Sequence, residues 1–302
     1  MYDIVNAQNP PLAIVTVTYS PGEHLANFLD SLGAATVGDT RVVLADNGST
    51  DGVPQAAAAA RDGVEFLDTG GNIGYGSGMN AAVRHLAPAR ARGEIDPDHF
   101  LITNPDVVFL PGSIDVLLRR ARQLPDAAAV GPRILEPDGS TYPSARAVPT
   151  LANGIGHALF GAVWPSNPWT ADYRHGASMD VEHTAGWLSG SCLLVRWDAF
   201  EAIGGFDERY FMYMEDVDLG DRFTRAGYDN VYCPEAVITH AQGHSTESHA
   251  VTMLPAHHES AYRFQADRLT RPWQIPVRWA LWWGLKLRAF VAVAAARSRS
   301  GD

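Results

Sequence analysis

The sequence has 302 residues, of which 46% are hydrophobic and 19% charged, so it can bury one large core or two modest ones. Its formal net charge of -11 argues against a nucleic-acid partner, because a duplex requires basic surfaces that release counterions. The charge is uneven: residues 271–302 carry +5, which leaves -16 for the rest of the chain. We therefore expect the C-terminal segment to have a purpose different from that of the body.

Apolar β-rich runs alternate with helical patterns in the first part of the chain. The sequence predicts strands at 12–18, 41–45, 64–68 and 100–103, and helices at 24–32, 53–61, 77–86 and 113–123. Repeated strand and helix units imply an α/β fold with a mainly parallel sheet. After residue 128 the alternation fades into short strands and turns, and one strong helix returns at 215–226.

No segment of the sequence resembles a signal or a membrane span. Residues 1–11 carry no basic region ahead of an apolar stretch, and the longest uncharged stretch, 147–171, is interrupted by proline, glycine and asparagine. Cys192 and Cys233 each lie in an apolar run, without a zinc-binding spacing or a disulfide framework. These features favour a cytoplasmic protein.

Polar residues follow two of the predicted strands, at the edge where parallel α/β sheets bind ligands. Asp46 opens a Gly/Ser/Thr turn, where its carboxylate could bind a base or ribose, or could simply cap the turn. The glycine loop 70–78 allows a ligand to approach the backbone. Met79, however, stands where the dinucleotide fingerprint needs its last glycine, which disfavours a dehydrogenase.

A possible metal site involves two further segments. Asp106, in Asn104-Pro105-Asp106, follows an apolar strand, where a carboxylate can bind Mg²⁺ or Mn²⁺ together with diphosphate oxygens. A simple Asn-Pro turn explains the tripeptide equally well. His240 follows a strand-like stretch and could complete the coordination, although a lone histidine is usually structural. His244 could contact phosphate or line a loop.

Segment 204–222 (GGFDERYFMYMEDVDLGDR) sets acids among bulky apolar residues, which is costly without a purpose. Asp216 shares a helix face with Leu219 and Phe223, so its carboxylate should point inward and have a raised pKa, as suits a general base. Glu215 is either its catalytic partner or a first-turn acid favoured by the helix dipole.

In their order and spacing these motifs resemble glycosyltransferase family 2, the inverting enzymes of GT-A (Rossmann-like) fold. The resemblance spans 12–245 and rests on Thr18-Tyr19, Asp46, Asn72, Gly74, Asn80, Asn104-Pro105-Asp106, Glu215-Asp216 and His240. It implies that Asp46 and Asn80 hold the nucleoside, with Thr18, Tyr19, Asn72, Gly74 and Asn104 around the nucleotide sugar. It further implies that Asp106 and His240 hold Mg²⁺ or Mn²⁺ and that Glu215 and Asp216 are catalytic, with Asp216 as the base.

One departure from the family bears on the donor. The metal motif of the family usually begins with aspartate, whereas this sequence has Asn104, as is common in the family's rhamnosyl branch. A deoxyribose in the nucleotide has one hydroxyl fewer for this residue to bind. The resemblance therefore implies dTDP-rhamnose as the donor. Segments 142–146 and 187–192 also resemble that branch, which implies a lipid-linked acceptor, polyprenyl-diphospho-N-acetylglucosamine, in cell-wall synthesis. Trp187, Ser189 and Gly190 are then expected on the acceptor side, although Trp187 could also be ordinary core.

The C-terminal segment interleaves aromatic and basic side chains, a composition typical of a helix lying in an anionic membrane interface. These residues are Trp273, Trp279, Trp282, Trp283 and Phe290, with Arg271, Arg278, Lys286 and Arg288. The alternative is a helix that packs its tryptophans on the body. Membrane binding would make the enzyme peripheral on the inner face of the cell membrane.

We expect residues 1–130 to form a nucleotide-sugar-binding half, 131–250 an acceptor and catalytic half of the same domain, and 251–302 a helical extension. Three rival functions remain open: transfer onto another cell-surface polysaccharide, a sugar nucleotidyltransferase, and a sugar-binding module without activity. The nucleotidyltransferase is disfavoured because no glycine- and lysine-rich loop occurs near residue 20. The oligomeric state, a homo-oligomer included, is also open.

Overall fold

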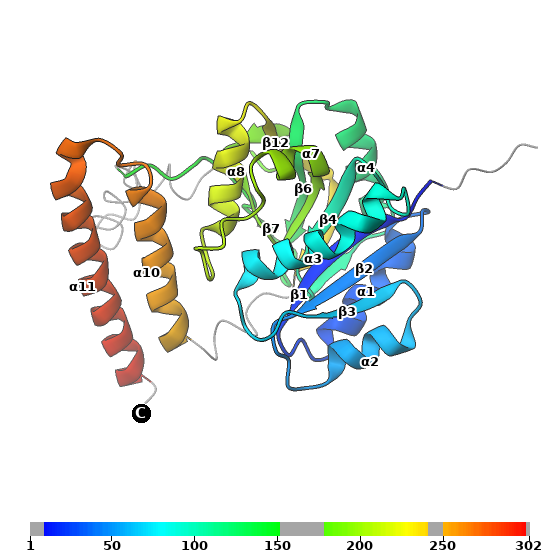
Figure 1. Cartoon of the computed structure of the whole chain (residues 1–302), viewed down its shortest axis with the longest axis horizontal. Coiled ribbons are helices and arrows are strands. Elements are labelled where there is room, and N and C mark those ends of the chain that lie inside the picture. The colour runs from blue at the N-terminus through cyan, green and yellow to red at the C-terminus, as the bar shows by residue number, and fades with distance from the viewer. Residues whose placement is uncertain (1–8, 152–177, 241–249, 300–302) are drawn as a thin grey trace, which may run out of the picture.

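A computed structural model describes residues 9–151, 178–240 and 250–299 of the chain. Among these residues, ten strands form one mixed sheet, whose main path runs β3-β2-β1-β4-β11-β6-β12-β5 (Figure 1). The first part of the chain supplies a run of four parallel strands at one end of the sheet. These strands are β1 (Leu12–Thr18), β2 (Thr40–Asp46), β3 (Val64–Asp68) and β4 (His99–Thr103).

The helices between these strands confirm the predicted alternation. They are α1 (His24–Ala35), α2 (Val53–Ala60), α3 (Tyr75–Ala91) and α4 (Ser113–Gln123). Helix α3 is longer at both ends than the sequence predicted. It continues past Pro88, where a helix was not expected to persist.

The second half departs further from the prediction of short strands and turns. Strands β6 (Ala127–Leu135) and β12 (Asp229–His240) are long and pair in parallel. Their pairing shifts between Cys233 and Val237, next to Pro234, which cannot donate a ladder hydrogen bond. Strand β11 (Cys192–Arg196) lies antiparallel between β4 and β6, and β5 (Val107–Phe109) pairs with the end of β12. Both halves of the chain therefore contribute to one sheet.

Among the residues that the structure describes in this half, four short strands and two helices remain. Strands β7 (Thr141–Tyr142) and β9 (His183–Ala185) join the main sheet, whereas β8 (Ala145–Arg146) and β10 (Trp187–Leu188) form a two-stranded sheet of their own. The helices are α7 (Trp197–Ala202) and α8 (Glu215–Arg225). The three-part division at residues 130 and 250 stays a prediction.

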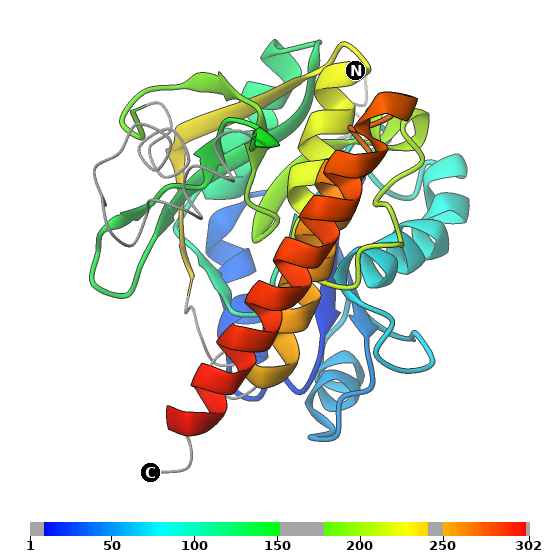
Figure 2. The same ribbon diagram turned by 90° about the vertical axis from the view of Figure 1, so that its left-hand side faces the viewer.

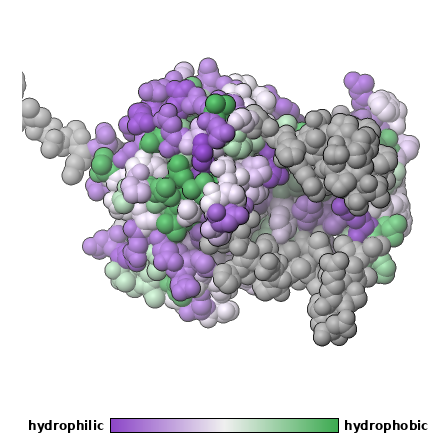
Figure 3. Space-filling model, turned by 180° about the vertical axis from the view of Figure 1, so that it is seen from behind, coloured by the Kyte–Doolittle hydropathy of each residue, from purple (hydrophilic) through white to green (hydrophobic). Residues whose placement is uncertain are grey.

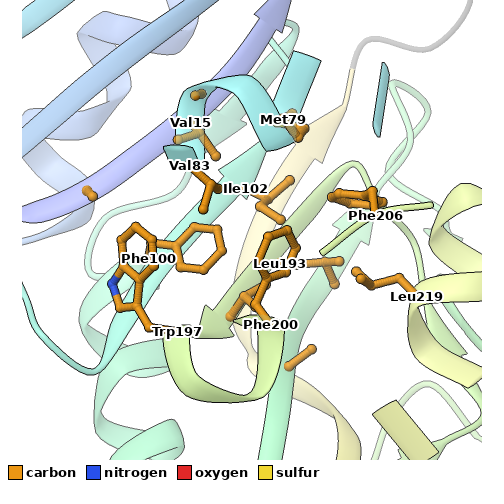
Figure 4. Packing of buried hydrophobic residues seen from close by; sticks show 14 of the residues in the cluster. Val15, Met79, Val83, Phe100, Ile102, Leu193, Trp197, Phe200, Phe206 and Leu219 are labelled. Carbon is orange, nitrogen blue, oxygen red and sulfur yellow. The ribbon is translucent and has the colours of Figure 1, made fainter. Parts of the chain in front are cut away.

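The core lies on both faces of the sheet because alternate residues of each strand point to opposite sides. In β1, Ala13 and Val15 pack with α3, α7 and α8, while Leu12 and Ile14 pack with α1 and α4. Figure 4 shows the first cluster, in which the rings of Phe100 and Trp197 lie 4.3 Å apart between centroids. These two packed layers hold the carboxyl ends of the strands in fixed positions.

The C-terminal extension is helical, as predicted, and consists of α10 (Ala250–Ala266), a short 3-10 turn η1 (Pro272–Gln274) and α11 (Ile275–Arg299). Helix α10 is fixed to the body by Phe264, which is buried against Tyr210 and Val217. Helix α11 packs on α10 and forms the outermost layer (Figures 1 and 2).

The surface seen from behind is mostly hydrophilic, with hydrophobic residues in small groups (Figure 3). Within the described ranges, no helix combines the length and the apolarity that crossing a bilayer requires.

Candidate active site

Asp46 ends β2 at the sheet edge, where it organises the first polar turn. Its carboxylate is only 2% exposed and accepts hydrogen bonds from the Thr18 hydroxyl at 2.7 Å and from the Ser49 amide at 2.9 Å. The turn-capping role left open by the sequence is therefore present. Thr18 is fully buried and positions Asp46, whereas the neighbouring Tyr19 is 51% exposed beside the same turn. A contact between Asp46 and the nucleoside stays a prediction.

The glycine loop is held against the turn that precedes α8. The Gly74 carbonyl accepts a hydrogen bond from the Asn47 side chain, and a Cβ on Gly74 would come within 2.4 Å of the Phe211 carbonyl oxygen. Gly74 also has a φ of 91°, so this position requires glycine. Asn72 is exposed, and its side-chain oxygen accepts the Gly74 amide at 3.3 Å.

Asn80 makes its hydrogen bonds within the protein, and the nucleoside contact that the resemblance implied stays a prediction. Its side chain is 6% exposed; it donates to the Phe206 carbonyl at 2.8 Å and accepts from the Phe206 amide at 3.0 Å. It also donates to the Glu208 carboxylate. Because both ends of the amide are bonded within the protein, we assign Asn80 to holding the turn around Phe206.

Asp106 and His240 come together although 134 residues separate them in the sequence. The pairing of β5 with β12 brings Asp106 Oδ1 to 3.1 Å from His240 Nε2. The side-chain nitrogen of Asn104 lies 3.4 Å from the same His240 nitrogen. Asp106 and His240 are 24% and 11% exposed, so a ligand can reach the pair. His244 lies outside the described residues.

The pair fits a divalent cation only in part, because the described residues contain no group of three or more His, Cys, Asp or Glu that could hold one. Such a deficit suits Mg²⁺ or Mn²⁺, which commonly take one or two protein ligands and complete their shell with phosphate oxygens and water. Two adjacent ligands about 2.1 Å from an octahedral ion lie about 3 Å apart, close to the observed separation. The protein would thus supply Asp106 and His240, and the substrate the rest.

Glu215 and Asp216 begin helix α8 after an unusual turn. Tyr213 and Met214 both adopt left-handed backbone conformations, with φ of 67° and 66°, which are uncommon for side chains of this size. The turn places the Asp216 carboxylate against the backbone of the segment after β10, where Oδ2 accepts the Gly190 amide at 3.0 Å. The other oxygen accepts the Val217 amide at 2.8 Å.

The two acids have different environments. Glu215 is 8% exposed, and its Oε2 has no hydrogen-bond partner among the described residues. Burial, with a further contribution from the charge of Asp216, raises the pKa of Glu215 to about 8. Burial also raises the pKa of Asp216, against the backbone hydrogen bonds from Gly190 and Val217, which lower it. The two backbone hydrogen bonds make Asp216 the more easily ionised acid of the pair, and Glu215 the one that keeps its proton more strongly.

A cavity of about 280 Å³ opens beside these acids. Its walls come from β8, β10, the start of α8 and α10, and include Arg146, Trp187, Asp216 and His257. Trp187 is half-buried, and its indole N–H donates to the Ala147 carbonyl at 3.1 Å, so one side of it lines the cavity while its edge is anchored. The predicted acceptor residue Trp187 thus lies beside the predicted base.

The other two predicted acceptor residues, Ser189 and Gly190, are buried and contact residues that form the site. Ser189 is 8% exposed, and its amide donates to the Ser144 carbonyl at 2.7 Å. Gly190 is buried and approaches Asp216 so closely that an added Cβ would lie 3.2 Å from the Asp216 Cβ. Gly220 plays a similar part: a Cβ there would lie 2.7 Å from the Trp187 Cα, so α8 packs directly on the backbone of β10.

Sequence reasoning missed two residues of this site. The Tyr75 hydroxyl donates to the Gly190 carbonyl at 2.6 Å and fixes the peptide whose neighbouring amide binds Asp216. Its position directly after Gly74 was the available signal. Arg146, in the segment YPSAR, lines the cavity together with Trp187. It lies in a two-residue strand, which leaves no periodic signal in the sequence.

Comparison with known proteins agrees with this geometry. A family model described as "Glycosyltransferase like family 2" matches residues 10–254. The chain is 51% identical over 292 residues to the N-acetylglucosaminyl-diphospho-decaprenol L-rhamnosyltransferase of Mycobacterium tuberculosis, covering 96% of this chain and 95% of the relative.

Solved structures resemble the fold at lower sequence identity. TarS 1–349 of S. aureus aligns with a TM-score of 0.56 at 13% identity, over 87% of this chain and 66% of TarS. The mannosyltransferase PcManGT from Pyrobaculum calidifontis, in complex with GDP-Man and Mn²⁺, aligns with a TM-score of 0.54 at 16% identity, over 98% and 82% of the two chains. The protein belongs to the glycosyltransferase family 2 group defined by the matching model and is a glycosyltransferase of GT-A fold.

Proposed function

We propose that the protein transfers L-rhamnose from dTDP-L-rhamnose to N-acetylglucosamine carried on a polyprenyl diphosphate, with inversion at the anomeric carbon. The observation that carries the proposal is the placement of the Asp216 carboxylate on the wall of the 280 Å³ cavity, with the Asp106 and His240 pair at the neighbouring edge of the sheet. The 51% identity to the mycobacterial rhamnosyltransferase over nearly its whole length supports the choice of donor and acceptor.

The chemistry is a single in-line displacement. Asp216, ionised and oriented by the Gly190 amide, removes the proton from the acceptor hydroxyl. The acceptor oxygen forms a bond to the anomeric carbon while the bond from that carbon to the diphosphate breaks, so dTDP leaves from the opposite face. Glu215 keeps its proton and thereby leaves Asp216 as the charged acid of the pair.

Asp106 and His240 are the residues that would hold a Mg²⁺ or Mn²⁺ ion. A bound divalent ion supplies charge neutralisation at the departing diphosphate. The contribution of the chain itself is to keep a carboxylate and an imidazole nitrogen 3.1 Å apart at this edge of the sheet, with Asn104 beside them.

We also propose that α11 docks on the inner face of the cell membrane. Its outward residues Trp279, Trp283, Leu287 and Phe290 are each more than 60% exposed and recur every three to four positions, as one face of a helix requires. Trp282 instead packs toward α10, and Lys286, which also belongs to α11, lies over its ring. The structure is therefore compatible with membrane contact for Trp279 and Trp283 and with packing inside the protein for Trp282.

Replacement of Asp216 tests the proposed chemistry. Asp216→Asn keeps the shape and removes the base, so kcat for rhamnosyl transfer should fall by about 10²- to 10⁴-fold. Asp198→Asn, at a 78% exposed side chain on α7, is the matched control and should leave kcat unchanged. Transfer by Asp216→Asn at the rate of the control would remove Asp216 as the base. Transfer only from other nucleotide sugars would overturn the proposed donor.

A further inference from the structure

Arg146 is a cation in the wall of the cavity without an acidic partner. Its guanidinium carbon lies 5.4 Å from the ring centroid of Tyr142 and 5.7 Å from that of Trp187, and its Nε donates to the Pro143 carbonyl at 2.7 Å. In the part of the chain that the structure describes, no salt bridge joins Arg146 to a carboxylate. Two rings and one hydrogen bond thus contact the planar group, and among the described residues no hydrogen bond or salt bridge is made by its terminal N–H groups.

The position of Arg146 relative to Asp216 follows from the strand pairing. Arg146 pairs with Trp187, and the chain then runs through Gly190, which binds Asp216, to Ser191, whose carbonyl accepts the Asn104 amide at 2.9 Å. This run of five residues spans at most about 14 Å over its four steps from Cα to Cα. Arg146 and Asn104 therefore lie toward opposite ends of the run, with the contact to Asp216 between them. Arg146 thus joins this arrangement where β10 begins, and Asn104 joins it just before β11 begins.

We infer that Arg146 binds the diphosphate that joins the acceptor sugar to its lipid. The inference rests on the proposed function and assigns a subsite within it. An arginine whose guanidinium lies over two rings presents paired donors that match phosphate oxygens, and these contacts reduce the side-chain entropy lost on binding. Trp187, next to Arg146 on the same wall, offers a face for the sugar that the diphosphate carries.

The remaining residues of the cavity wall indicate where the lipid of the acceptor would leave the cavity. His257 of α10 lines the cavity, and α11 packs on the same helix, with its aromatic residues facing outward. An acceptor whose sugar reaches Asp216 and whose diphosphate reaches Arg146 would leave the cavity beside the layer proposed to contact the membrane. A lipid-linked diphosphate is thus the acceptor chemistry that this arrangement fits.

A rival role for Arg146 is electrostatic support of Asp216, whose pKa its positive charge lowers. The two roles differ in how they depend on the acceptor. A phosphate-binding arginine matters only for acceptors that carry phosphate, whereas support of the base matters for every acceptor. The electrostatic role would also move the pH profile of the reaction.

The test compares two acceptors: an alkyl diphosphate of N-acetylglucosamine and a neutral alkyl N-acetylglucosaminide. Arg146→Met should lower kcat/KM for the diphosphate acceptor about 10- to 100-fold, mainly through KM, with about the same kcat/KM as wild type on the neutral acceptor. Arg146→Lys, which keeps the charge and loses the planar fork, should fall between wild type and Arg146→Met. Arg119→Met, at an exposed arginine of α4, is the control.

Each other outcome is decisive. An equal loss on both acceptors, measured above the acidic limb of the pH profile, would assign Arg146 to Asp216 or to folding and overturn the inference. A raised KM for the donor with an unchanged KM for the acceptor would assign Arg146 to the donor diphosphate, which also overturns it. Failure of the wild type to use the diphosphate acceptor, despite transfer to another acceptor, would instead refute the proposed function.

Discussion

The proton held by Glu215 should be measurable as a pH-dependent cost to stability. The pKa of Glu215 is about 8 in the folded protein, against 4.5 in an unfolded chain. As pH rises above 4.5, the unfolded state releases this proton while the folded state keeps it, so the free energy of unfolding falls. The fall continues until pH passes about 8, where both states are ionised. At about 1.4 kcal/mol per pH unit, the cost reaches about 3 kcal/mol at pH 7.

Glu215→Gln removes this cost because the amide has the shape of the protonated acid and does not titrate. Urea unfolding at pH 5, 6, 7 and 8 should show the variant gaining stability over wild type with each step. Glu235→Gln, at a 76% exposed side chain, is the control and should follow the wild-type curve. Asp216 is present in all three proteins, so most of its titration cancels. A difference between Glu215→Gln and wild type that does not change with pH would refute the reasoning.

The other predictions concern the metal and the membrane. Asp106→Asn should weaken Mn²⁺ binding in the presence of dTDP by about tenfold or more in titration calorimetry, and chelation of divalent ions should abolish transfer; full activity in EDTA would contradict the site. Replacing Trp279 and Trp283 together by glutamate should reduce sedimentation with anionic vesicles and leave KM for the donor unchanged. Val37→Glu, at a side chain 98% exposed on the body, is the control, and equal sedimentation of both proteins would exclude α11 as the docking surface.

The first half of the fold could be predicted from the sequence because its signals are local. The strands of the parallel part are rich in apolar residues, and helices such as α1 and α4 have a buried stripe, so the order of elements follows from periodicity. The insertion of β11 between β4 and β6 is different, because it depends on pairing between residues far apart in the chain. A single sequence carries no direct record of such pairing.

The candidate site shows the same division. Residue type and order sufficed to select Asp106, Asp216 and His240. The structure puts Asp106 beside His240 and binds Asp216 to the Gly190 amide, and the catalytic and metal-binding roles of the three residues stay predictions. The nucleoside contact implied for Asn80 stays a prediction, and its hydrogen bonds to Phe206 could not be foreseen because an amide side chain suits a ligand and a backbone turn equally well. Arg146 was missed because its value comes from the rings around it, which only the tertiary fold brings together.

The close packing of Gly220 on Trp187 has a consequence for comparing enzymes of this type. With a Cβ only 2.7 Å from the Trp187 Cα, no other residue fits at position 220 unless α8 moves away from β10. Because Asp216 lies one turn earlier on α8, such a shift would carry the base away from the cavity wall. The size of residue 220 therefore limits how far the base can lie from Trp187. A larger side chain at this position in a relative would identify an enzyme that holds its acceptor differently.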